Sequence, residues 1–205
     1  MRAPIVTSTT RRRTVGLAAG SIWLVAASAV FEIWALAAIG TPIARRLLVA
    51  TIVLVSAIVA FGVLVARSAA RIPAEPVRRS EQRLASRFAW VVGAEILALF
   101  VVNSWAVATR RFVLIPSLDL IVIGFHFFPL AWLFGVPRYH VLALCFCAIP
   151  AATLLLFPEA SLIGHAQNWY VLPNLGCGMV ATITAAASLR EAWASIPGEV
   201  ALTAR

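Results

Sequence analysis

The stretch from Val49 to Ala66 reads VATIVLVSAIVAFGVLVA and contains no charged residue. About 20 helical residues of this kind cross the hydrocarbon core of a bilayer, which is roughly 30 Å thick. A strand of a transmembrane β-barrel would instead alternate apolar and polar residues with period two over about ten residues. The uninterrupted run therefore predicts a membrane-spanning α-helix.

The rest of the chain repeats this pattern. Apolar residues make up 62% of the 205 residues and charged residues 12%, which is about half the charged share of a soluble domain. Six apolar runs cover residues 15–39, 47–66, 88–108, 112–134, 141–157 and 171–189. We therefore predict an all-α fold, a polytopic transmembrane helical bundle that forms one integral membrane domain over residues 1–205. A basic cytoplasmic linker is expected over residues 67–87.

The arginines predict the orientation, because positive residues concentrate on the cytoplasmic side of a membrane. If six spans alternate, thirteen of the 17 basic residues lie on the side of both termini, and all of them are arginine. The other four are Arg45, Arg46, Arg110 and Arg111. Both termini are therefore expected in the cytoplasm. Topology and attraction to anionic headgroups account for the net charge of +9, so no nucleic-acid partner is expected.

Two segments allow a second interpretation. The sequence RRRTVGLAAGSIWLVAASA, from Arg11 to Ala29, resembles a signal peptide, but its apolar run continues to Ile39, so we favour an uncleaved span. The segment from Ser80 to Arg87 is either part of the linker, which we favour, or a helix lying along the headgroups. A short interfacial helix is also expected near Pro158.

Ionisable residues inside a membrane are costly, so each one is a functional hypothesis. The spans contain a set of such candidates, together with one amide: Glu32, Glu95, Asn103, Asp119 and His126. Their depths predict an outer layer of Glu32, Asn103 and Asp119 and an inner layer of Glu95 and His126. Asp119 and His126 are seven residues apart, nearly two helical turns, so they share one helix face. We expect the five residues to form an internal polar path.

Pro129 lies one turn after His126 and removes the hydrogen bond to the carbonyl of Phe125, which predicts a helix bend. Structural roles remain open for these residues. If a helix begins at Pro116, Asp119 lies in its first turn, where a carboxylate favours the helix dipole. His126 would alternatively hydrogen-bond Glu95 or a backbone carbonyl between helices.

Other chemistry has little support in the sequence. Cys145 and Cys147 are two apart and point to opposite sides of a helix, while Cys177 stands alone, so neither a metal site nor a cofactor is expected. No phosphate loop or catalytic motif appears, and we do not expect an enzyme. Gly176 and Gly178 allow close helix contact, although their spacing of two is not the usual motif.

The segment from Arg87 to Tyr139 resembles a group of small multi-span bacterial membrane proteins without a known activity. The resemblance rests on GAEILALF (93–100) and on GFHFFPLAWLFGVPRY (124–139), which follows a G-x-H-F-x-P-L-A-x-x-F pattern. It implies a multi-pass membrane protein and marks Glu95, His126, Pro129 and Pro137 as positions of interest. The Ala- and Arg-rich composition also indicates a bacterium with a GC-rich genome, hence the bacterial cytoplasmic (inner) membrane.

These observations predict the permeation or transport of a small solute or proton through the polar path. The alternative is a non-catalytic membrane partner or assembly subunit whose intramembrane charges pair with another protein. The protein is expected to be surrounded by lipid, and its expected partner is a second copy of the chain in a homodimer or an unknown membrane protein. A transporter requires the acids and His126 to converge inside the bundle, whereas a partner subunit leaves at least one of them facing outward.

Overall fold

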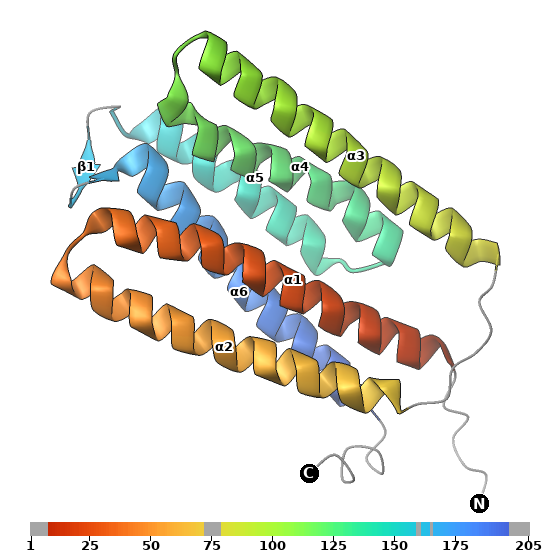
Figure 1. Ribbon diagram of the computed structural model, residues 1–205. Coiled ribbons are helices and arrows are strands. Elements are labelled where there is room, and N and C mark those ends of the chain that lie inside the picture. The colour runs from red at the N-terminus through yellow and green to blue at the C-terminus, as the bar shows by residue number, and fades with distance from the viewer. Residues whose placement is uncertain (1–7, 72–78, 159–160, 165, 197–205) are drawn as a thin grey trace, which may run out of the picture.

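The computed structural model describes residues 8–71, 79–158, 161–164 and 166–196. They form long helices joined by short connections (Figure 1). The helices are α1 (Ser8–Ile39), α2 (Pro42–Ala70), α3 (Arg79–Ala108), α4 (Ile115–Phe134), α5 (Arg138–Leu156) and α6 (Asn168–Ala194). Each of the six is long and apolar enough to cross a membrane. The predicted all-α bundle with six candidate spans is therefore confirmed.

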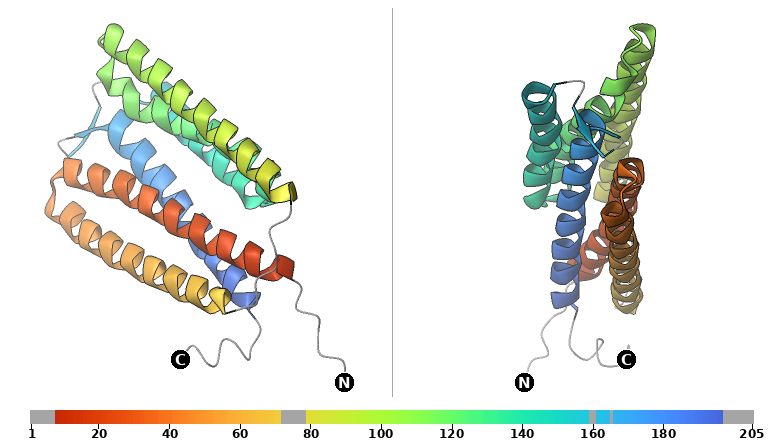
Figure 2. Two further views of the ribbon diagram at one scale, coloured as in Figure 1. Left: turned by 45° about the vertical axis from the view of Figure 1, so that its right-hand side comes forward. Right: turned by 90° about the vertical axis from the view of Figure 1, so that its left-hand side faces the viewer.

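The last helix lies at the centre of the bundle. Helix α6 packs against α1 and α2 on one side and against α4 and α5 on the other, and Figure 2 shows it between α1 and α5. Half of its most apolar stretch is buried, whereas only 6% of that of α3 is buried. Helix α3 lies at the edge, beside α4 (Figure 1). The bundle is thus two groups of helices, α1–α2 and α3–α5, that meet on α6.

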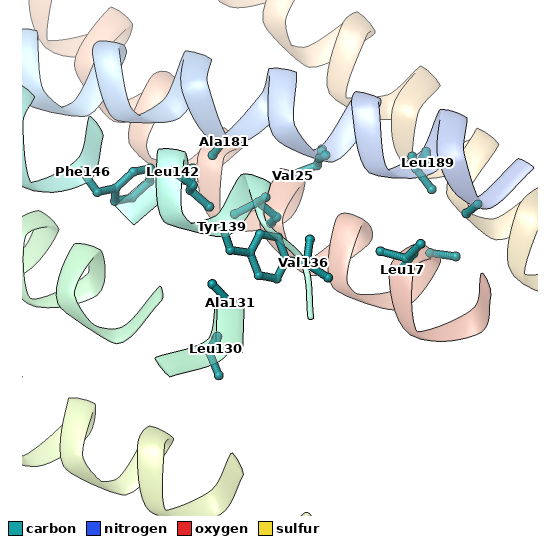
Figure 3. Close-up of a cluster of buried hydrophobic side chains, with 14 of the residues drawn as sticks. Leu17, Val25, Leu130, Ala131, Val136, Tyr139, Leu142, Phe146, Ala181 and Leu189 are labelled. Carbon is teal, nitrogen blue, oxygen red and sulfur yellow. The ribbon is translucent and has the colours of Figure 1, made fainter. Parts of the chain in front are cut away.

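The buried core joins these groups near the end where α1 begins and α6 ends. Figure 3 shows labelled side chains of α1, α4, α5, α6 and the α4–α5 connection meeting there. The labelled members are Leu17, Val25, Leu130, Ala131, Val136, Tyr139, Leu142, Phe146, Ala181 and Leu189. Burying such side chains favours the packed arrangement in proportion to the apolar area they cover.

Helices begin and end at residues whose side chains or backbone conformations suit a helix terminus. The Thr41 hydroxyl accepts a hydrogen bond from the Ala44 amide at 3.2 Å and caps α2, which begins at Pro42. Gly135 ends α4 with φ 62°, a left-handed conformation that glycine adopts without a Cβ clash. These tight turns place α1 beside α2, and α4 beside α5.

Two connections differ from the expected ones. Helix α3 already begins at Arg79, so the segment from Ser80 to Arg87 continues into the span instead of forming a separate linker or headgroup helix. No glycine or proline interrupts the helix there. The described part of the segment near Pro158 forms a two-stranded hairpin, β1 (Leu162–Ile163) with β2 (Ala166–Gln167), rather than a helix.

Candidate functional site

Glu32 is buried between α1, α2 and α6. It is the one acidic or basic residue that is buried in the described part of the chain, at 6% exposure. The Thr182 hydroxyl of α6 and Glu32 Oε1 are hydrogen-bonded at 3.0 Å, and the Thr51 side chain of α2 is a second polar neighbour of the carboxyl group. Ser28, one helical turn before Glu32, lies 2.9 Å from the Thr182 hydroxyl. The carboxyl group is therefore surrounded by hydroxyl groups.

Gly178 provides the space for this carboxyl group. A Cβ atom on Gly178 would lie 2.5 Å from Glu32 Cγ, and one on Gly176 would lie 2.9 Å from the Ile149 side chain. Both glycines thus permit close helix contact, as the sequence indicated. The hydroxyl partners were not predicted. A signal existed, because Ser28 precedes Glu32 by four residues and Gly178 precedes Thr182 by four, which places each pair on one helix face.

A second polar contact joins α3 and α4. His126 Nδ1 lies 3.2 Å from Glu95 Oε1, and the two side chains are 14% and 16% exposed. The distance suits an ion pair, but the two groups are not aligned as a hydrogen bond, and Nδ1 has no hydrogen-bond partner among the residues that the structure describes. The interhelical pairing of His126 with Glu95 is therefore present as a close contact.

A third contact joins the same two helices seven residues earlier along α4. Asn103 Nδ2 donates to Asp119 Oδ1 at 2.7 Å and to the Leu99 carbonyl at 2.9 Å. Asp119 lies beyond the first turn of α4, which contains no acidic residue. Its position is explained by this partner on α3 rather than by the helix dipole.

Asp119 and His126 therefore share the face of α4 that contacts α3, as their spacing predicted. We call these four residues, Glu95, Asn103, Asp119 and His126, the α3–α4 seam. Glu32 does not join them, because its partners lie on α2 and α6. The five candidates thus occupy two places in the bundle. Helix α4 continues through Pro129 to Phe134, and the predicted bend stays a prediction.

A cavity of about 380 Å³ opens where α4 begins. Its lining residues come from the 3-10 turn η1 (Phe112–Leu114), the start of α4 and the start of α6. They are Phe112, Val113, Ile115, Pro116, Gln167 and Tyr170. Pro116 precedes Asp119 by three residues, about one turn, so the cavity lies close to the pair of Asn103 and Asp119 in the seam.

An ion-pair cluster lies at the end of the bundle opposite to this cavity. Glu191 of α6 lies 2.8 Å from the Arg13 guanidinium of α1 and also pairs with Arg138 of α5. Arg138 donates to the Ser188 hydroxyl at 3.3 Å. The cluster brings the beginning of α1 and the end of α6 to the same end of the bundle. Sequence reasoning missed it, because Glu191 lies outside the predicted spans.

The cysteines form no chelating site among the described residues. Cys145, Cys147 and Cys177 are free thiols, and the Cys147 thiol lies 3.8 Å from the Ile121 carbonyl. Within the described ranges, no group of three His, Cys, Asp or Glu side chains is arranged to hold a metal ion.

Comparison of the chain with protein-family models, with curated proteins and with solved structures finds no match. The resemblance of residues 87–139 to small multi-span bacterial membrane proteins therefore stays a prediction.

Proposed function

We propose that the protein is a multi-pass protein of the bacterial cytoplasmic membrane that conducts protons, or a small polar solute, along the α3–α4 seam. The six apolar helices support insertion, and the excess of arginine at one end supports cytoplasmic termini. A fluorescent protein fused after Arg205 should fluoresce. Alkaline phosphatase inserted at Arg110 should be active. The opposite pattern would refute this orientation.

The observation that carries the proposal is the pair of polar contacts on one seam. A carboxyl group with an amide lies nearer the outer cavity, and a carboxyl group with an imidazole lies deeper. Placing such groups in a bilayer is energetically unfavourable, and where they occur they typically mark ion or proton pathways. Protons fit the seam best, because its side chains are packed between two helices and the two ring nitrogens of an imidazole can accept a proton on one side and donate one on the other.

The two contacts are separated by seven residues of α4, or about 10 Å along the helix axis. A hydrogen bond spans about 3 Å, so a proton cannot pass directly from Asp119 to His126. Water or movement of the seam must link them. The carbonyl of Phe125, which Pro129 leaves without its usual amide donor, lies next to His126 and is one acceptor for such a water molecule.

The test is proton flux into liposomes that contain the purified protein and a pH-sensitive dye. A potassium gradient with valinomycin sets the driving force. We expect Asp119→Asn, Glu95→Gln and His126→Ala each to lower the flux at least tenfold. Phe125→Ala is the matched control for His126→Ala, because Phe125 is its neighbour but is 63% exposed. Equal flux in protein-free liposomes, or equal effects of both alanine variants, would refute the proposal.

A partner subunit is the second candidate function. It is favoured by α3, whose apolar side chains on the face away from α4 are largely exposed, including Trp90 at 78% and Phe100 at 69%. Lipid covers such a face in a monomer, while another helix covers it in an assembly or a homodimer. Mass measurement of the detergent-solubilised protein by light scattering distinguishes these cases. A monomer with proton flux favours transport, whereas a stable assembly without flux favours the partner role.

We do not propose an enzymatic activity, because the described residues include no paired nucleophile and base on which to argue one.

A further inference from the structure

The hydroxyl groups around Glu32 have too few hydrogens for their contacts. Glu32 contacts Thr182, Thr182 contacts Ser28, and the Ser28 hydroxyl lies 2.9 Å from the Val25 carbonyl. These are three hydrogen-bond contacts, but the two hydroxyl groups supply only two hydrogens, and a carbonyl and a carboxylate supply none. The hydroxyl groups of Thr182 and Ser28 therefore satisfy two of the three contacts. The third is satisfied if the carboxyl group of Glu32 carries a proton.

A protonated carboxyl group gives the chain of bonds one consistent direction. Glu32 donates to the Thr182 hydroxyl, Thr182 donates to Ser28, and Ser28 donates to the Val25 carbonyl. Each of the three hydrogens then has one acceptor, and neither buried hydroxyl is left without a partner, which would be unfavourable.

The charges around Glu32 lead to the same conclusion. The facing parts of α1, α2 and α6, residues 14–39, 47–66 and 168–189, contain no Lys, Arg or His. The other titratable groups on these stretches are Tyr170 and the thiol of Cys177, and neither is positively charged in any state. No ion pair to Glu32 occurs in the described part of the chain. A buried carboxylate without a cation is strongly unfavourable, so the group becomes neutral instead.

We propose that Glu32 is a proton-binding site, in which the carboxylic acid of α1 begins a hydrogen-bonded chain that runs through Thr182 of α6 and returns to Ser28 and Val25 of α1. The site is separate from the α3–α4 seam and does not depend on the proton flux proposed there. A monovalent cation such as sodium is the competing ligand, because a carboxylate, hydroxyls and a carbonyl are oxygen ligands that suit hard cations. The direct contacts of 2.9–3.0 Å and the close approach of Gly178 favour the proton, because they leave no gap at the centre of the group.

The test is infrared spectroscopy of the full chain in liposomes at neutral pH. A protonated carboxyl group has a carbonyl stretch that a carboxylate lacks. We expect one such band in the wild type that is lost in Glu32→Gln and retained in Asp119→Asn. Thr182→Val is expected to shift this band without abolishing it, because it removes only the acceptor of the acid proton. This second variant preserves the test if Glu32→Gln does not fold.

The outcomes separate the ligands. A band that is unchanged when sodium chloride replaces choline chloride supports the proton site. A band that disappears on adding sodium at constant pH overturns the proposal in favour of a cation site. The absence of any Glu32-dependent band in the wild type at neutral pH shows an ionised carboxylate and also overturns it. Neither result bears on the seam, since flux is measured separately.

Discussion

Replacing Gly178 with alanine tests how closely α1 and α6 approach each other. The new Cβ atom would lie 2.5 Å from Glu32 Cγ, 3.1 Å from Oε1 and 3.2 Å from Cδ. Carbon atoms in contact normally stay about 3.5–4.0 Å apart. The two helices must therefore separate by about 1 Å, or the Glu32 side chain must leave its position and lose its 3.0 Å hydrogen bond with Thr182.

The expected cost follows from these alternatives. Overpacking a buried contact costs about 1–3 kcal/mol, and an interhelical hydrogen bond in a membrane protein contributes about 0.6 kcal/mol on average. The higher helix propensity of alanine than of glycine offsets up to about 1 kcal/mol of this loss in the free energy of unfolding. We expect Gly178→Ala to lower the free energy of unfolding by about 0.5–2.5 kcal/mol. A change of 1.4 kcal/mol corresponds to about tenfold in the unfolding equilibrium.

The assay is reversible unfolding in mixed micelles with increasing dodecyl sulfate, followed by far-ultraviolet circular dichroism. Gly93→Ala is the matched control, because a Cβ atom on Gly93 meets nothing within 4 Å. It should be neutral or slightly stabilising. Glu32→Ala removes the atoms that clash, so the double variant Glu32→Ala, Gly178→Ala should show a favourable coupling in a double-mutant cycle. If Gly178→Ala is as mild as Gly93→Ala, or the coupling is zero, the described packing of α1 on α6 is wrong.

Three further predictions use the same unfolding titration. Gly124→Ala should cost about 1–3 kcal/mol, because its Cβ atom would lie 2.7 Å from Cys147 Sγ on α5; a cost no greater than that of an exposed Gly→Ala change would contradict this contact. Asn103→Ala leaves Asp119 without its amide donor and should cost about 1–2 kcal/mol, while Asn103→Ser, which keeps a hydroxyl donor, should recover part of it. Glu191→Gln removes the pairing with both arginines at a partly exposed site, so we expect a loss below about 1 kcal/mol that shrinks as salt is raised; a loss independent of salt would indicate a packing effect instead.

Hydropathy and helix periodicity by themselves determine the spans of this protein and some of the residues that share a helix face. The six spans follow from apolar runs, because a continuous run of the right length is a local property of the chain. The shared face of Asp119 and His126 follows from their spacing of seven, because the helix repeats every 3.6 residues. The starts at Pro42 and near Pro116 follow from the fixed backbone angle of proline.

The partners of the polar residues were decided only by the tertiary structure. Two candidate acids at similar predicted depths, Glu32 and Asp119, lie in different groups of helices, one facing Thr182 and the other facing Asn103. Depth along a helix can be read from the sequence, but the neighbour across an interface depends on how the helices are arranged around α6. Apolar surfaces attract one another without direction, so hydropathy does not encode this arrangement. Close approach at positions such as Gly178 and the hydroxyl groups of facing helices decide it.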